Sequence, residues 1–250
     1  MSQIIWKVTG DTHADFSRFY LLNKMAEEEN CHYNVIILGD MGVNFWLGER
    51  DKVLKKRIVA KYPHLTFYGV RGNHEARPRA VEGMALTYDE AVEGFVYSQK
   101  DYPSIKYFQD GCCYKINGYL TLVLGGAYSV DKDYRLAKKA QGLYGGWFED
   151  EQLSPEERER IFQHMKDRTY DLILSHTCPI SWEPRDLFLS FIDQSKVDKS
   201  IEIWMDQLRQ NIEYRVWLFG HFHDDRICAH GAQMLYHTIQ DLDEIMEYWK

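Results

Sequence analysis

Six short apolar runs, rich in β-branched and aromatic residues, recur along this chain and limit the folds that it can adopt. Near-continuous apolar runs of this length, separated by helical patterns, are typical of strands that are covered on both faces. The sequence therefore predicts a layered α/β fold. The expected strands are residues 4–9, 34–39, 65–70, 119–126, 170–175 and 214–219.

Helical patterns fill most of the intervals between these runs. Ser154 followed by Pro155 and two glutamates is typical of an N-cap and a first helical turn. Asn117-Gly118 and His230-Gly231 each separate two apolar segments, which predicts hairpins and hence antiparallel strands beside the parallel ones. The expected helices are residues 14–29, 50–60, 77–100, 132–140, 155–167 and 199–211.

The chain has 250 residues, of which 45% are hydrophobic, so it can bury the core of one large domain. We expect a single domain over residues 1–250, with a loop-helix insertion at about 127–168. No apolar run approaches the roughly 18 residues of a membrane span, and the first residues show no signal-peptide pattern. The expected protein is cytoplasmic, with no membrane partner.

The charge and the cysteines exclude several functions. A formal net charge of -8 argues against an extended grip on nucleic acid, although it allows a small phosphorylated substrate. The 5 cysteines include no Cys-x-x-Cys pair, so the sequence predicts neither a disulfide framework nor a thiolate zinc site.

Metal-ligand types of residue stand at the carboxyl ends of five of the apolar runs. The carboxyl edge of an open α/β sheet is where ligands bind, so residues far apart in sequence can meet there. His221 and His223 form a His-x-His pair, and residues i and i+2 of an extended segment share one face. The predicted site residues are Asp11, His13, Asp40, Asn73, His74, His176, His221 and His223.

The segments "GDTH", "GDMG", "GNHE", "SHT" and "GHFH" resemble, in this order, the five motifs of the calcineurin-like metallophosphoesterase superfamily. They extend from residue 10 to residue 223. The resemblance implies a four-layer α-β-β-α sandwich with mixed sheets and two divalent metal ions at the strand ends. It also implies a metal-dependent phosphoric ester hydrolase.

The resemblance assigns the ligands residue by residue. One ion would be bound by Asp11, His13, Asp40 and His223, and the other by Asp40, Asn73, His176 and His221, so Asp40 would bridge the two. Oxygen and imidazole donors without thiolate suit Mn²⁺, Fe²⁺/Fe³⁺ or Zn²⁺.

His74 would be the general acid of this family, because an imidazole titrates near neutral pH and can protonate a leaving alkoxide. The inferred reaction is attack of a metal-bridging hydroxide on a phosphomonoester or a small phosphodiester. Two alternatives stay open: a nucleotide phosphodiesterase or nuclease, and a metal-binding scaffold without catalysis. Glu75 is expected to anchor the following helix.

The second motif departs from that of the phosphoprotein phosphatases of this superfamily. Val43 stands where those enzymes have the aspartate that orients the catalytic histidine, and Asn44 stands where they have a phosphate-binding arginine. This makes a protein phosphatase of that type doubtful. Candidate substrate-recognition residues are Arg71, Arg77, Arg185, Trp46, Trp182 and Tyr128.

Overall fold

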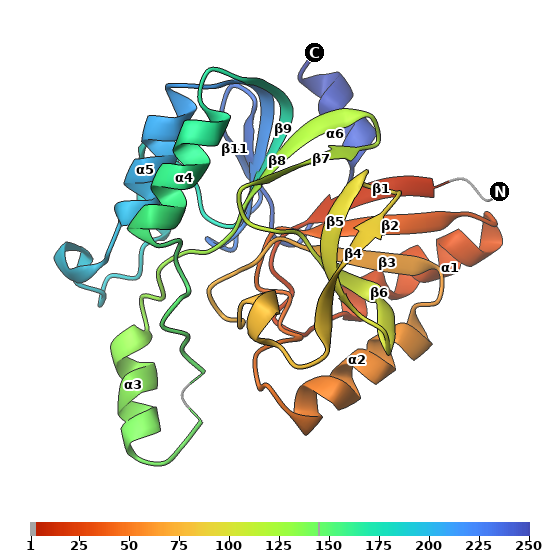
Figure 1. Cartoon of the computed structure of the whole chain (residues 1–250), viewed down its shortest axis with the longest axis horizontal. Helices are drawn as coiled ribbons and strands as arrows, with labels where there is room; N and C mark the ends of the chain where they lie inside the picture. The colour runs from red at the N-terminus through yellow and green to blue at the C-terminus, as the bar shows by residue number, and fades with distance from the viewer. Residues whose placement is uncertain (1–3, 145) are drawn as a thin grey trace.

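Two mixed β-sheets form the centre of the computed structural model, which describes residues 4–144 and 146–250 (Figure 1). The first sheet has seven strands, and its middle strands β1, β2, β3 and β6 are parallel. Its order is β13 (Gln240–Asp241), β1 (Ile4–Thr9), β2 (His32–Ile37), β3 (Leu65–Gly69), β6 (Tyr102–Tyr107), β5 (Gly94–Gln99) and β4 (Met84–Asp89).

The second sheet has six strands, of which β8, β9, β10 and β12 are parallel and the two edge strands are antiparallel to their neighbours. Its order is β11 (Arg226–Ala229), β12 (Ala232–Met234), β10 (Glu213–Phe219), β9 (Thr169–Ser175), β8 (Tyr119–Leu124) and β7 (Cys112–Ile116).

The apolar runs are nearly continuous because both faces of each strand are covered. In β2, Val35 and Ile37 pack among the residues of the first two helices. Ile36, between them, belongs with Leu172 and Leu218 to the core that joins the two sheets. Successive side chains of a strand point to opposite faces, so a strand with apolar layers on both sides needs an apolar residue at every position.

Helices cover the outer face of each sheet (Figure 1). The first sheet is covered by α1 (Tyr20–Glu28) and α2 (Glu49–Lys61), and the second by α4 (Pro155–Met165) and α5 (Ser200–Arg209). A short helix, α6 (Leu242–Tyr248), packs on the core between the sheets. This arrangement confirms the predicted four-layer α-β-β-α sandwich with mixed sheets.

The helix expected at residues 77–100 is wrong. That stretch forms a short 3-10 turn, Pro78–Ala80, followed by the antiparallel strands β4 and β5, which extend the first sheet through β6. Gly83 has φ +72° and Glu93 has φ +48°, conformations that end a helix. Aromatic and β-branched residues in both segments favour a pleated surface, and the available edge of β6 decides the outcome.

Both predicted hairpins are present, joining β7 to β8 and β11 to β12. Asn117 and Gly118 both have positive φ, as a tight two-residue turn requires. Within the stretch 127–168, α3 (Lys132–Ala140) extends away from the sheets and has no buried residue, whereas α4 packs on the second sheet (Figure 1). The boundaries of a single domain with an insertion stay a prediction.

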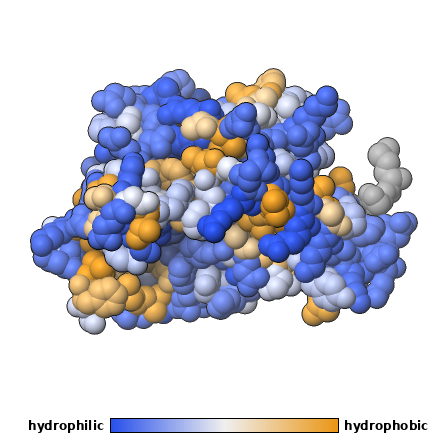
Figure 2. Space-filling model, turned by 90° about the horizontal axis from the view of Figure 1, so that it is seen from below, coloured by the Kyte–Doolittle hydropathy of each residue, from blue (hydrophilic) through white to orange (hydrophobic). Residues whose placement is uncertain are grey.

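None of the helices within the described residues is both long enough and apolar enough to cross a membrane. The face seen in Figure 2 is mostly hydrophilic and carries separate, smaller hydrophobic patches. Small, scattered hydrophobic patches are normal on a protein surface.

Candidate metal centre

The parallel strands bring the predicted site residues to one edge of the molecule. Asp11 follows β1, Asp40 follows β2, and Asn73 with His74 follows β3. In the second sheet, His176 comes directly after β9, and the pair at 221 and 223 follows β10. The strands β1 to β3 run parallel, as do β8 to β10, so these carboxyl ends lie together. All eight predicted residues therefore meet in one cluster.

Asp11, His13 and His223 form one group of potential ligands, with ligand atoms within 4.8 Å of one another. The Nε2 atoms of the two histidines are 2.9 Å apart, and Asp11 Oδ2 lies 3.2 Å from His223 Nε2. Asp11 Oδ2 is buried, yet within the described part of the chain it accepts no hydrogen bond. A cation fits this group, because an orphaned carboxylate oxygen and two imidazole nitrogens converge on one point.

Asp11, Asp40 and His176 form a second group, also within 4.8 Å. His176 Nε2 lies 3.7 Å from Asp40 Oδ2 and 2.8 Å from the Asn73 side-chain oxygen. On the other side of the ring, Nδ1 is 2.8 Å from the carbonyl oxygen of Leu38. Nδ1–H can donate to that carbonyl, which leaves the lone pair of Nε2 facing the cluster, as in many metal-binding histidines.

Asp11 is thus the carboxylate common to both groups in this arrangement of side chains. The bridging role that the resemblance gives to Asp40 stays a prediction. His221 lies beside the second group: its backbone N–H donates to Asp11 Oδ1 at 3.0 Å, and its ring meets that of His176 edge-on, with centroids 4.9 Å apart.

The backbone of the cluster is strained. Four of the predicted site residues, none of them glycine, have positive φ: His13 at 45°, Asp40 at 44°, His221 at 70° and His223 at 57°. Each such residue costs about 1–3 kcal/mol, and such strain is concentrated at functional sites. The fold therefore holds these side chains in place at the expense of local conformational energy.

Glycines before the ligands make room for residues from other strands. A Cβ on Gly72 would lie 1.9 Å from Asp40 Oδ1, and a Cβ on Gly220 would lie 2.3 Å from Asp11 Oδ1. Contacts that short are impossible, so a side chain at either position would displace a carboxylate of the cluster. This explains why the motifs read Gly-Asn and Gly-His at these strand ends.

Electrostatics keep most of the cluster in the protonation states that bind cations. Burial by itself raises the pKa of Asp11 and of Asp40, but the facing imidazoles outweigh burial and hold both pKa values below the ordinary range. Burial lowers the pKa of His13, and it lowers that of His221 to about 3. His223 is the exception, because the Asp11 carboxylate 3.2 Å away raises its pKa, so this ring must lose its proton when a cation binds. Ionised carboxylates and neutral imidazoles are the forms that metals require.

His74 lies at the edge of the cluster, with a side chain that is 23% exposed. Its Nε2 is 3.8 Å from Asp40 Oδ2 and 3.3 Å from the Asn73 amide nitrogen, and its backbone N–H donates to Asp40 Oδ1 at 2.8 Å. Nδ1 of His74 is buried and has no hydrogen-bond partner among the described residues. The ring is therefore held by packing and by the Asp40 loop, without the orienting carboxylate that Val43 replaces.

Two residues that support Asn73 carry no recognisable signal in the sequence. The Asn73 amide donates to Ser129 Oγ at 2.8 Å, and the Ser129 hydroxyl and backbone N–H donate to the two carboxylate oxygens of Glu151 at 2.6 and 3.0 Å. This series of hydrogen bonds turns the Asn73 side-chain oxygen toward His176. Both residues come from the irregular segment after β8, where a serine and a glutamate are unremarkable.

Glu75 has a different role from the one expected, because no helix directly follows it. It is buried, accepts hydrogen bonds from the Gly72 N–H at 2.9 Å and from the Tyr107 hydroxyl at 2.8 Å, and so fixes the loop after β3. Burial raises the pKa of Glu75 to about 7.

Several candidate recognition residues are structural. Arg71 is 1% exposed and donates to Asp110 and to the Glu151 carbonyl, and Arg77 donates to Glu157. Trp182 packs on the core of the second sheet, with its ring 5.4 Å from that of Trp217. These side chains therefore hold the loops around the site.

The other three candidates differ in their surroundings. Trp46 lines a second pocket, of about 280 Å³, and His13 and His74 line this pocket as well. Arg185 is exposed in a 3-10 turn, and Tyr128 lines the main cavity. Asn44, in the place of the phosphate-binding arginine, is fully buried and accepts a hydrogen bond from Lys55.

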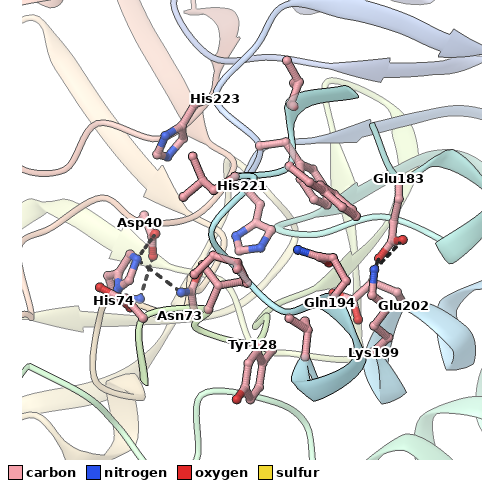
Figure 3. Close-up of a pocket in the computed structure, with 18 residues that line it drawn as sticks. Asp40, Asn73, His74, Tyr128, Glu183, Gln194, Lys199, Glu202, His221 and His223 are labelled. Atoms are coloured by element: carbon pink, nitrogen blue, oxygen red, sulfur yellow. Dashed lines mark hydrogen bonds and ion pairs between the residues drawn. The ribbon is translucent and has the colours of Figure 1, made fainter. Parts of the chain in front are cut away.

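A cavity of about 490 Å³ opens from the cluster (Figure 3). Its near end is lined by Asp40, Asn73, His74, His221 and His223. Its far wall comes from the segment 183–202, which contains short 3-10 turns and the start of α5. A small organic ester fits in a cavity of this size.

A family model described as calcineurin-like phosphoesterase matches residues 7–225. The chain belongs to this family and is a metal-dependent hydrolase of phosphoric esters. The structure is also similar to the crystal structure of a phosphopantetheinyl hydrolase from Mycobacterium tuberculosis, with a TM-score of 0.43 and 12% sequence identity over 94% of this chain and 89% of that chain. None of the curated proteins matches this sequence.

Proposed function

We propose that this chain hydrolyses phosphomonoesters or small phosphodiesters with two divalent cations held at the strand ends. The observation that carries the proposal is the pair of adjoining ligand groups that share Asp11, at one end of a cavity of about 490 Å³. The first ion would be held by Asp11, His13, Asp40 and His223, and the second by Asp40, Asn73, His176 and His221, with Asp40 bridging the two. Mn²⁺, Fe²⁺/Fe³⁺ and Zn²⁺ all suit these oxygen and nitrogen donors.

When bound, the two cations would supply hydroxide from water near neutral pH and neutralise negative charge on the phosphoryl oxygens. The protein residues do the rest. His74 lines both the main cavity and the smaller hollow beside Trp46, so its ring borders the space where an ester would bind. From there it donates a proton to the leaving oxygen. Ser129 and Glu151 keep the Asn73 oxygen directed at the cluster.

A small substrate is favoured over a nucleic-acid strand, the alternative suggested by the family resemblance. Apart from its histidines, the described residues that line the cavity include a single cationic side chain, Lys199, and this is paired with Glu183 at 2.8 Å. Backbone phosphates are bound by several lysines or arginines. The expected cytoplasmic location stays a prediction, and the 5 cysteines are free thiols.

The test is hydrolysis of p-nitrophenyl phosphate and bis-p-nitrophenyl phosphate by protein stripped with a chelator and then reloaded with Mn²⁺. We expect turnover only after reloading, and the ratio of the two rates states whether the site prefers a monoester or a diester. Protein that holds two equivalents of metal and cleaves neither compound would contradict the proposal and favour a metal-binding scaffold.

A further inference from the structure

The main cavity has several apolar side chains among the residues that line it. Val130, Leu187, Phe188, Ile192 and Phe222 line it, and they come from the segment before α3, the stretch between β9 and α5, and the loop after β10. Phe188 and Phe222 stack with ring centroids 6.4 Å apart. A space beside a phosphate-binding centre with such walls suits the carbon skeleton of an ester.

The charged groups of this cavity are mainly acidic. Asp131, Glu183 and Glu202 line it, whereas the one ammonium among its lining residues, on Lys199, is bound by both carboxylate oxygens of Glu183 at 2.8 and 2.9 Å. Figure 3 shows Lys199, Glu183 and Glu202 together at the end of the cavity away from Asp40 and His74. A second phosphate or a carboxylate on the substrate would meet like charge there.

Glu202 has an unfilled hydrogen-bonding position. Its side chain is 5% exposed, and Oε1 accepts a hydrogen bond from the Thr177 hydroxyl at 3.0 Å. Oε2 is buried and has no hydrogen-bond partner within residues 4–144 and 146–250. Buried polar atoms in native structures nearly always have a partner, so an oxygen left without one beside a cavity indicates a donor that the cavity receives.

We propose that this cavity binds the organic group of the ester, and that this group is apolar and ends in a hydrogen-bond donor, an amine or a hydroxyl, that reaches Glu202 Oε2. The inference deepens the proposed function and rests on it, because the phosphoryl group must lie at the strand ends. It selects uncharged or cationic phosphate esters and excludes nucleoside polyphosphates. The apolar side chains bind the organic group, and Glu202 selects substrates in which this group ends in an amine or a hydroxyl.

Four aryl phosphates with similar leaving oxygens test this choice: phenyl phosphate and its para derivatives with 2-aminoethyl, 2-hydroxyethyl and 2-carboxyethyl groups. With Mn²⁺-loaded protein at pH 8, where Glu202 is ionised because this pH lies above its pKa of about 7, we expect kcat/KM to be about tenfold higher for the amine than for phenyl phosphate, mainly through KM. The hydroxyl compound should lie between these two, and the carboxylate should be the poorest. Equal kcat/KM for the amine and the carboxylate would overturn the proposal.

The variant Glu202→Gln tests whether Oε2 causes the preference for the amine ester. Glutamine keeps the volume and an oxygen for the Thr177 hydroxyl, but it replaces Oε2 with an amide donor. The ratio of kcat/KM for the amine to that for phenyl phosphate should fall about tenfold. Glu82→Gln, at a side chain that is 92% exposed, is the matched control and should keep the wild-type ratio. An unchanged ratio in Glu202→Gln would overturn the role of this oxygen.

A binding measurement separates this proposal from the proposed function. Tyramine, the phenol released from the amine ester, should bind to the wild-type protein in calorimetry. It should bind to Glu202→Gln about tenfold more weakly. If tyramine binds in this way but no ester is hydrolysed, the proposed function fails and the cavity assignment stands. If esters are hydrolysed without preference and tyramine does not bind, the cavity assignment fails and the function stands.

Discussion

The strand-end cluster and the far wall of the cavity are built in opposite ways. In the cluster, polar side chains such as Asp11 and His176 are almost fully buried, and they are held by strand ends, strained backbone and hydrogen bonds. The far wall belongs to a segment of short 3-10 turns in which Leu189 is 51% and Phe191 79% exposed. The first region is therefore held from many sides, whereas the second carries apolar side chains that are exposed to solvent.

This difference separates the chemistry from the choice of substrate. Groups that bind cations and transfer protons must keep their geometry, so they lie on the rigid sheets. Groups that recognise the organic part of a substrate lie on irregular segments, where substitutions are tolerated. We therefore expect substitutions in the cluster to abolish turnover, and substitutions in the wall to change selectivity or local stability.

The largest effect should come from Asp40→Asn. Losing this carboxylate should lower hydrolysis by about 10³-fold or more and reduce bound metal, because the cations supply several kcal/mol of charge stabilisation. The fold should persist, since asparagine can still accept the His74 backbone N–H. Metal content by mass spectrometry and initial rates measure this, with Asp133→Asn on the exposed α3 as the control. Unchanged metal content and rate would remove Asp40 from the site.

His74→Ala should separate proton transfer from metal binding. We expect full metal content and a fall in kcat of about 10²–10³-fold on alkyl phosphates, whose leaving groups need a proton. The loss should be smaller on p-nitrophenyl phosphate, since p-nitrophenolate leaves without protonation. Equal losses on both substrates would show that His74 positions the substrate and does not act as an acid.

Gly72→Ala tests whether the cluster is as tightly constrained as its geometry indicates. The added Cβ would lie 1.9 Å from Asp40 Oδ1, so we expect the free energy of unfolding to fall by about 1–3 kcal/mol and metal affinity to fall at least about tenfold. Gly48→Ala is the matched control, because a Cβ there meets nothing within 4 Å. Urea denaturation and metal titration measure both effects. If the two variants behave alike, the loops of the cluster are more adaptable than we argue.

The smallest effect concerns the wall of the cavity and depends on pH. Burial raises the pKa of Glu202 to about 7 from an unfolded value of 4.5, so between these pH values the folded state binds more protons than the unfolded state. The free energy of unfolding of the metal-free wild type should therefore fall as pH rises from 5 to 8, by about 1–2 kcal/mol relative to Glu202→Gln.

Urea denaturation at pH 5 and pH 8 measures this difference, and Glu82→Gln should follow the wild type at both. Parallel behaviour of wild type and Glu202→Gln would mean that Glu202 titrates as an exposed carboxyl. Such a result would contradict the burial of Glu202 Oε2, on which the proposed selectivity of the cavity for the terminal group of the substrate depends.

Most of the fold could be predicted because both faces of the central strands are buried. Covered strands must be apolar at nearly every position, and this leaves runs that can be recognised in the sequence. The error at residues 77–100 arose where that signal is weak. β4 is mostly exposed, and its pairing with β5 depends on the free edge of β6, which no local pattern reveals.

The sequence by itself determined the strand-end cluster: Asp11, Asp40, Asn73 and the histidines each follow a recognisable apolar run. The link between an apolar run and the polar residue after it is local, so it can be read along the chain. Only the tertiary structure decided what surrounds that cluster. The support of Asn73 by Ser129 and the position of Glu202 at the end of an apolar cavity depend on how distant, irregular segments pack, and packing leaves no periodic trace in the sequence.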